Sequence, residues 1–168
     1  MSTDSDTTVE AEARATYAQY VAARDRIEAG ELPWSALADF FTDDAVFVDP
    51  AWGRVEGRAA IAKFMDESMA GLEDWRFPEQ WTVAEGNRLV SFWWNRLPGS
   101  RPDGTPYQAP GISIMTYAGN GKFSQEVDLL NMTEVGELFR DSGWTPPPTM
   151  NMPPRHPVRD ISPPGRGA

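Results

Sequence analysis

The segment from Asp43 to Met65 constrains the fold more than any other part of the chain. A short apolar run, Ala45–Val48, ends directly at Asp49-Pro50, where the proline cannot continue a β-ladder and biases the aspartate towards an extended conformation. An aromatic turn follows, and then Gly57 precedes an amphipathic helix. The pattern predicts a strand that ends at Asp49, with its carboxylate beside Trp52 and beneath the helix. A carboxylate in that place is a candidate base in an apolar pocket.

Composition excludes several functional classes. The chain has 168 residues, which predicts one domain, and its net charge of −10 argues against nucleic acid or an anionic membrane surface as a partner. It has no cysteine, and its one histidine, His156, lies in a proline-rich stretch, which argues against thiol chemistry, a Ser-His-Asp triad and a histidine metal centre. We find no signal peptide or apolar span in the sequence. We therefore expect a soluble cytoplasmic protein that uses no metal or other cofactor.

Helical periodicity is concentrated in the first part of the chain. The predicted helices span residues 8–29, the stretch after Pro33, residues 58–70 and residues 133–141. The first would begin at a capping box, Thr7-x-x-Glu10, and end at Gly30. The second would bury a stripe that extends to Phe41, and the last would begin at Thr133 as its N-cap.

From Trp75 onward the period of the apolar residues changes to two, which is typical of strands. The predicted strands span residues 75–85, 89–97, 107–117 and 122–132. Turn-rich connections such as Gly119-Asn120-Gly121 join them into an antiparallel meander. Helices followed by such strands predict an α+β fold, a cone-shaped curved sheet that wraps around the N-terminal helices and leaves one deep pocket.

Composition changes again at Thr145. Eight of the fifteen prolines lie in residues 145–168, so this segment can form neither a core nor the interior of a helix. We divide the chain into a domain of residues 1–144 and a tail of residues 145–168. The tail is predicted to be disordered or to lie over the surface in extended form, and docking of a partner is a third interpretation.

The order of these elements resembles the nuclear transport factor 2-like (cystatin-like) superfamily, and within it the SnoaL-like and ketosteroid-isomerase-like proteins. The resemblance covers about residues 9–139 and rests on two motifs, Asp44-Ala45-x-x-x-Asp49-Pro50 and Gly57-x-Ala59-Ala60-Ile61-x-x-Phe64. It implies that Asp49 is the general base and that Tyr17 donates to the substrate oxyanion. The family's second donor, a protonated aspartate, falls near Ser113 and is therefore absent.

Two further branches of the superfamily imply a role for Asp128. The stretch from Gly121 to Asp128 resembles the last strand of limonene-type epoxide hydrolases, whose aspartate is catalytic, but the Arg-x-Asp of their preceding strand falls on Trp93-Trp94-Asn95. That departure argues against epoxide hydrolysis. Polyketide cyclases also use a last-strand aspartate as an acid–base group, whereas scytalone-dehydratase-like chemistry requires pocket histidines that this chain lacks.

Each candidate also has a plain structural interpretation. Asp49 can simply form an Asp-Pro turn or cap the helix, and Tyr17 can be a core residue. Asp128 shares a strand face with Glu126 and Leu130, so alternation alone does not say whether that face points inward. We place it inward, where an unpaired carboxylate must be protonated, paired or hydrated.

Adjacent residues of a strand face opposite ways, so Trp93 and Asn95 are placed in the cavity and Trp94 on the outer face. Trp94 together with Ile112, Ile114 and Thr116 would make the outer face apolar, which predicts a homodimer through it. The expected substrate contacts are Trp52, Phe64, Trp93, Asn95, Ser113, Met115 and Leu130.

The sequence thus predicts an acid–base enzyme acting on a hydrophobic cyclic small molecule, with ketosteroid-isomerase-like proton transfer favoured. Asp49 would be the base, Tyr17 and Ser113 the oxyanion donors, and Asp128 and Asn95 would orient substrate or water. Cyclisation, dehydration and hydrolysis are the other reactions considered. The alternative from another class is a ligand-binding module of the same fold without catalysis.

Overall fold

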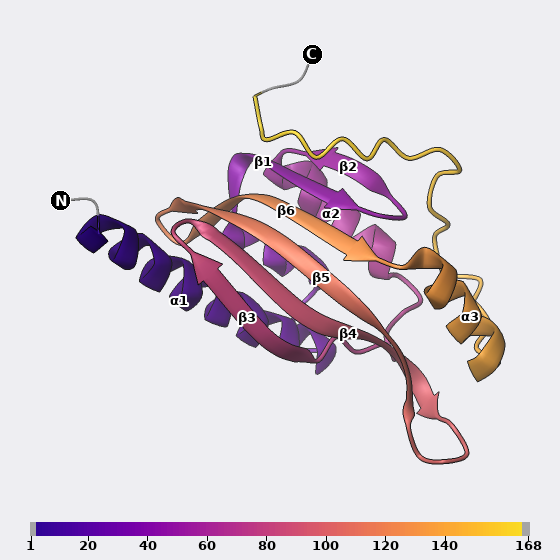
Figure 1. Cartoon of the computed structure of the whole chain (residues 1–168). Helices are drawn as coiled ribbons and strands as arrows, with labels where there is room; N and C mark the ends of the chain where they lie inside the picture. Colours follow the sequence, from indigo (N-terminus) through magenta and orange to yellow (C-terminus); the bar gives the residue numbers. More distant parts are fainter. Residues whose placement is uncertain (1–2, 166–168) are drawn as a thin grey trace.

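The computed structural model describes residues 3–165, with side chains from Thr7 onward. It is an α+β structure in which one curved sheet, not closed into a barrel, wraps around helices on its concave side (Figure 1). The helical elements are α1 (Thr3–Glu28), the 3-10 helix η1 (Trp34–Phe40), α2 (Arg58–Met69) and α3 (Met132–Ser142). The strands are β1 (Phe41–Asp49), β2 (Gly53–Glu56), β3 (Glu79–Glu85), β4 (Arg88–Ser100), β5 (Pro106–Gly119) and β6 (Lys122–Leu130). The predicted fold class is confirmed.

The six strands lie in the order β2-β1-β6-β5-β4-β3. Strands β3 to β6 form the predicted antiparallel meander, whereas β1 pairs with β6 in parallel. The short β2, which the sequence patterns did not predict, folds back on β1 as an antiparallel neighbour. Its first residue, Gly53, has a φ of 87°, a conformation that favours glycine, and this turn lets the chain reverse directly after Asp49.

Several predicted boundaries are wrong for local reasons. Helix α1 begins one turn before the proposed capping box, so Thr7 lies inside it. Phe41 ends η1 by adopting an extended conformation and belongs to β1. The N-cap of α3 is Asn131 and not Thr133, because the Asn131 side chain accepts hydrogen bonds from the amides of Thr133 and Glu134 at 3.2 and 3.4 Å. The strand predicted from Trp75 begins only at Glu79, after Pro78.

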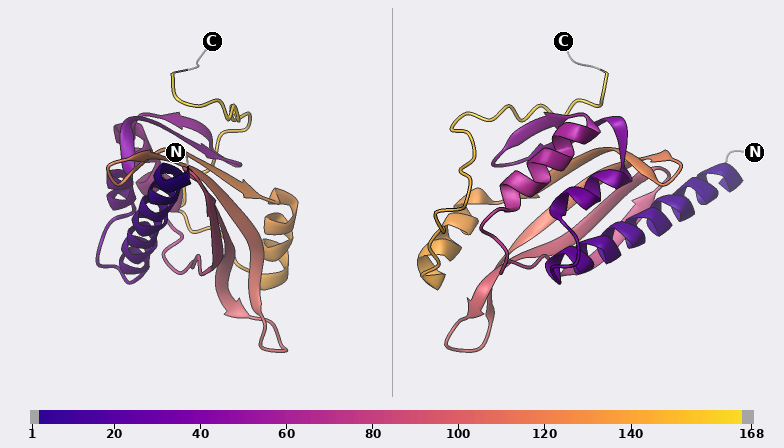
Figure 2. Two further views of the ribbon diagram at one scale, coloured as in Figure 1. Left: turned by 60° about the vertical axis from the view of Figure 1, so that its left-hand side comes forward. Right: turned by 180° about the vertical axis from the view of Figure 1, so that it is seen from behind.

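Two apolar clusters fill the concave side of the sheet. The larger one packs α1, η1 and α2 against β1 and the middle strands, and includes the fully buried Phe41, Ile61 and Phe123. The smaller one lies under α3 and includes Trp75 and Leu97. Figure 2 shows that α1, η1 and α2 cover the same face of the sheet, whereas no helix within residues 3–165 covers the opposite face of β3, β4 and β5. The space between the two clusters is where the candidate site lies.

The C-terminal tail runs in extended form along β2 and past the end of α2 (Figure 1). Its backbone is held by Arg54, whose amide donates to the Val158 carbonyl at 2.6 Å, and by Gln125, whose side chain donates to the Ile161 carbonyl at 2.8 Å. Asn151 attaches it to α2 through the Glu67 carbonyl at 2.8 Å. Among the described residues, no helix is both long and apolar enough to cross a membrane.

Candidate active site

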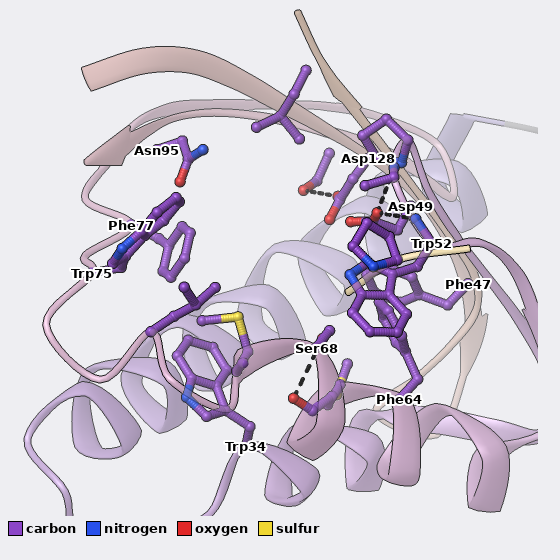
Figure 3. Close-up of a pocket in the computed structure, with 18 of the residues that line it drawn as sticks. Trp34, Phe47, Asp49, Trp52, Phe64, Ser68, Trp75, Phe77, Asn95 and Asp128 are labelled. Atoms are coloured by element: carbon purple, nitrogen blue, oxygen red, sulfur yellow. Dashed lines mark hydrogen bonds between the residues drawn. The ribbon is translucent and has the colours of Figure 1, made fainter. Parts of the chain in front are cut away.

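A pocket of about 300 Å³ lies between the two apolar clusters (Figure 3). This volume is at the lower end of the ~300–1,000 Å³ that is typical of small-molecule sites. Aromatic rings make up much of the wall, and they are Tyr17, Tyr20, Trp34, Phe47, Trp52, Phe64, Trp75, Phe77, Trp93 and Phe139. Such a lining favours a flat apolar ligand.

Asp49 lies at the edge of the pocket at the end of β1. Its Oδ1 accepts hydrogen bonds from the amides of Ala51 and Trp52 at 2.7 and 2.8 Å, so the carboxylate closes the Asp-Pro turn. Burial raises the pKa of Asp49, and these two amides and the positive charge of Arg159 oppose that rise. Because both amides contact Oδ1, the turn interpretation and a role for Oδ2 in the pocket are compatible.

Asp128 lies on the neighbouring strand β6 and also lines the pocket. Val48 of β1 pairs with Val127 of β6 in parallel. Asp49 and Asp128 are the residues that follow these two, so they lie side by side on the concave face. Figure 3 shows the two carboxylates close together at one end of the pocket. The inward placement expected for Asp128 therefore agrees with the strand register.

A chain of hydrogen bonds reaches Asp128 across three strands. The indole Nε1 of Trp93 donates to Ser113 Oγ at 3.0 Å, and the Ser113 hydroxyl donates to Asp128 Oδ1 at 2.6 Å. Burial raises the pKa of Asp128 to about 7, the Ser113 hydrogen bond opposes the rise, and the negative charge of Asp49 adds to it. The raised pKa favours the protonated form of Asp128. A hydroxyl has one proton to donate, and in this structure Ser113 gives it to Asp128; the expected role of Ser113 as an oxyanion donor stays a prediction.

A third acid, Glu126, lines the pocket and was not among the predicted site residues. It is 3 % exposed and accepts a hydrogen bond from the Tyr20 hydroxyl at 3.3 Å. Burial raises its pKa well above the ordinary value, and the Asp128 charge raises it further. The signal was present in the sequence, because Glu126 precedes Asp128 by two residues on the same strand face.

Tyr17 lines the pocket beside Tyr20, and their rings stack with centroids 5.8 Å apart. Burial raises the pKa of Tyr17, which keeps its hydroxyl protonated. The charges that act on this hydroxyl include those of Arg24, Glu79 and Glu126. Because Arg24 belongs to α1 and Glu79 to β3, the Tyr17 hydroxyl faces the part of the wall that these two elements form.

The other predicted contacts divide into two groups. The pocket is lined by Trp52, Phe64, Trp93, Asn95, Ser113 and Leu130, as expected. Met115 is fully buried in the larger apolar cluster instead and does not line the pocket. Met115 does lie on the inward face of β5, as predicted, but it is two residues beyond Ser113 and lies beneath the helices.

Two parts of the pocket have no counterpart among the predicted residues. Arg24 of α1 contributes a buried cation, although its helix has a charged composition that is typical of a solvated surface. Met150, Met152 and Pro153 of the tail line the pocket as well. The tail is therefore part of the site, and its Arg159 donates to the Pro50 carbonyl at 2.6 Å, directly beside Asp49. Within the described residues, no group of three His, Cys, Asp or Glu side chains is placed to hold a metal ion.

Comparison with protein families identifies one matching profile. The profile of the SnoaL-like domain matches residues 18–126, which include the second part of α1, the Asp49 turn and the meander up to Glu126. A search of curated proteins finds no match.

Solved structures with the same fold carry several different names. A protein from Xanthomonas campestris pv. campestris with an inferred polyketide cyclase assignment is 21 % identical, with a TM-score of 0.55 over 75 % of this chain and 95 % of the other. A steroid delta-isomerase from Pseudomonas aeruginosa is also 21 % identical, with a TM-score of 0.58 over 80 % and 91 %. The epoxide hydrolase/cyclase-like enzyme SalBIII is 19 % identical, with a TM-score of 0.57 over 74 % and 95 %. At these identities the likeness concerns the fold.

Proposed function

The chain belongs to the family of SnoaL-like domains, and we propose that it is an acid–base enzyme that transfers a proton on a hydrophobic, ring-containing small molecule by means of its own carboxyl groups. One observation carries this proposal. Asp49 and Asp128 lie side by side at one end of an apolar pocket, and their environments differ. Paired carboxyl groups with different environments separate into a base and an acid.

Asp49 is the base in this proposal. Two backbone amides hold its Oδ1, which leaves Oδ2 to take a proton from a carbon next to a ring carbonyl. The electron pair of the broken C–H bond then moves onto the carbonyl oxygen and gives an enolate. The aromatic walls exclude bulk water, which strengthens the electrostatic interactions of the charged intermediate.

Asp128 is the acid. Its pKa of about 7 leaves a substantial protonated fraction at neutral pH, and Ser113 and Trp93 fix its orientation. The protonated carboxyl group gives its proton to the enolate oxygen or to a second carbon of the ring system. If Asp128 protonates the second carbon, the proton held by Asp49 passes to the neighbouring Asp128. If Asp128 protonates the enolate oxygen, Asp49 delivers its proton to the second carbon and the enol O–H returns its proton to Asp128. In both cases the isomerisation ends with both carboxyl groups in their initial protonation states.

Ring closure is the second candidate reaction, and it is favoured by the position of Asp128 on the last strand. The same enolate would attack a second carbonyl carbon of the substrate, and Asp128 would protonate the alkoxide that forms. Both reactions share the first step, which is abstraction of a carbon-bound proton by Asp49. A ligand-binding module without catalysis would bind the same ring compounds and leave this proton in place.

The shared step can be measured without knowledge of the natural substrate. We expect the protein to catalyse exchange of the acidic ring protons of 2-tetralone, a bicyclic ketone, in deuterated water, measured by proton NMR. Asp49→Asn should lower the exchange rate by about a hundredfold or more, because general-base catalysis typically contributes 10²–10⁴-fold. Asp44→Asn, which changes an exposed acid on the same strand, is the matched control and should exchange at the wild-type rate.

Binding of 2-tetralone without exchange would establish the non-catalytic module. Equal exchange rates for wild type and Asp49→Asn would remove Asp49 as the base.

A further inference from the structure

The pocket has a second polar end opposite the two aspartates. Figure 3 shows Asn95 of β4 on the far side of the pocket from Asp49 and Asp128. Asn95 is 4 % exposed, and its buried Oδ1 accepts no hydrogen bond from any described residue. An unpaired polar atom is costly inside a protein and is normally satisfied. Its position in the pocket wall indicates a partner that occupies the pocket.

Arg24 is the second unsatisfied group in this part of the wall. Its side chain is 9 % exposed, and its acidic neighbour is Glu79, with Nη2 and Oε2 3.6 Å apart. That distance is too long for a good hydrogen bond, and both Arg24 Nε and Glu79 Oε2 lack partners among the described residues. The surface pairs Arg14–Glu10 and Arg26–Glu31 are closer, at 3.0 Å each.

The strand register places Glu79, and with it the end of the Arg24 side chain, near Asn95 in the pocket wall. Glu79, the ion-pair partner of Arg24, lies opposite Trp93 in the sheet, two residues before Asn95 on the same face. Phe77 lies next to the bridge between Arg76 and Arg96, which places it across from Asn95. The amide of Phe77 is held by Glu28, one helical turn after Arg24 on α1.

The two groups have complementary hydrogen-bonding roles. A guanidinium only donates, and the Asn95 oxygen only accepts. Glu79 already supplies a negative charge beside Arg24, so a neutral ligand group satisfies the site without burying a further charge. A hydroxyl group is neutral and can accept from Arg24 while it donates to Asn95.

We propose that Arg24 and Asn95 form an anchor for a substrate hydroxyl group on the side of the pocket across from Asp49. The substrate class is then a hydroxylated ring ketone and not a pure hydrocarbon ketone. Asn95 and Asp128 lie on strands separated by β5 and on opposite sides of the pocket, so a fused ring system would extend between the anchor and Asp128. The anchor rests on the proposed function, because it takes the ring ketone of that function as its occupant.

Binding of three related ketones tests the anchor. The probes are 6-hydroxy-2-tetralone, 6-methoxy-2-tetralone and 6-methyl-2-tetralone, with dissociation constants measured by quenching of tryptophan fluorescence at constant pH. We expect the hydroxyl compound to bind wild type about tenfold more tightly than the methyl compound, because a hydrogen bond to a charged group is worth about that factor. The methoxy compound accepts but cannot donate, so it should have an intermediate affinity.

Variants locate the preference in the two side chains. Arg24→Met and Asn95→Leu should each remove most of the tenfold preference and leave the affinity of the methyl compound within about twofold. Arg76→Met is the matched control, because Arg76 forms an ion pair with Glu28 of the same helix at 4.0 Å but does not line the pocket. It should retain the full preference.

A spectroscopic readout keeps the test independent of how well Arg24→Met folds. The Arg24 Nε–H resonance, assigned by its absence from Arg24→Lys, should shift downfield with the hydroxyl compound and stay in place with the methyl compound. Equal affinities for the hydroxyl and methyl compounds in wild type, a preference that survives in both variants, or no binding of any of the three would overturn the anchor. If wild type does not prefer the hydroxyl compound but still exchanges the ring protons of 2-tetralone, the anchor is wrong and the proposed function stands. If wild type prefers the hydroxyl compound but does not exchange these protons, the proposed enzyme function is wrong and the anchor stands.

Discussion

Asp128 is the side chain on which the charges and hydrogen bonds of the pocket act together. It lies beside the charge of Asp49, near the buried Glu126 and at the end of the hydrogen bonds from Trp93 and Ser113. Its pKa is raised in the folded protein, so the folded state keeps a proton that the unfolded chain has already lost. Ionisation of Asp128 therefore lowers the free energy of unfolding. The protonated form, which is the proposed acid, is also the form in which the fold is more stable.

The sign of this linkage gives a prediction about stability. The unfolded chain loses the Asp128 proton near pH 4 and the folded protein loses it near pH 7, so the free energy of unfolding should fall as the pH rises between these values. Asp128→Asn keeps the neutral form at all pH values and still accepts from Ser113. Thermal and urea unfolding should show it roughly 1–3 kcal/mol more stable than wild type at pH 8, with little difference at pH 4.

The same variant should be inactive in proton exchange, because an amide cannot act as the acid. Asp44→Asn, at an exposed position, should show neither change. A loss of stability of equal size at both pH values would contradict the link between ionised Asp128 and instability.

At the scale of elements, the tail and the Asp49 turn act together. Residues 149–162 run in extended form over the edge of the domain, with Arg54 and Gln125 holding their backbone. The Arg159 side chain donates to Pro50, and its positive charge lowers the pKa of Asp49. The base is thus adjusted by a segment that contributes nothing to either apolar cluster except the partly buried Met150.

Removal of this charge should move the pH dependence of the reaction. Arg159→Gln is expected to raise the pKa of Asp49 and shift the acid limb of the exchange rate to higher pH, because the positive charge that opposes the rise is removed. Arg159→Lys should restore most of the wild-type profile. Arg155→Gln, which removes an exposed charge of the same tail, should not shift it. An unchanged acid limb in Arg159→Gln would show that the tail does not act on the base.

The elements also show which inferences local patterns permit. The strand, the Asp-Pro step and the following helix are neighbours in sequence, so Asp49 and its turn could be located, and alternation placed Trp93 and Asn95 inward. Glu126 and Asp128 lie beside β1 through a parallel pairing of segments about eighty residues apart, and no local pattern encodes that pairing. Arg24 pairs with Glu79 across 55 residues of sequence, and on a charged helix it resembles a surface residue. The tail, which is rich in proline, contains no periodicity that would indicate where it docks.

At the scale of the whole molecule, the outer face of the sheet stands out. Trp81 stacks on Phe92, and Phe92 contacts Trp94 edge-to-face, with ring centroids 5.3 Å apart in both pairs. Trp81 and Leu129 are each 50 % exposed on this face, where none of the described helices covers β3, β4 and β5 (Figure 2). A continuous apolar surface of this kind is uncommon on monomers.

We therefore predict that the protein is a homodimer through this face, with a two-fold axis that brings Trp94 near its copy. Light scattering coupled to size-exclusion chromatography should give twice the chain mass for wild type. Trp94→Glu should give a monomer, because a charge at the centre of an apolar interface is not compensated. Ile161→Glu, which adds a charge at an exposed apolar residue of the tail, should remain dimeric. A monomeric wild type at micromolar concentration would contradict the prediction.

Part of the pocket wall comes from the tail, whereas the apolar clusters come mainly from the rest of the chain. This arrangement affects how the pocket of such a protein can change in evolution. Met152 and Pro153 help to line the pocket, but neither belongs to the two clusters that hold the domain together. Substitutions there can alter which molecules are admitted while the melting temperature stays nearly constant. In a lineage of this family, new substrate preferences could accumulate in the last twenty residues long before the catalytic strands change.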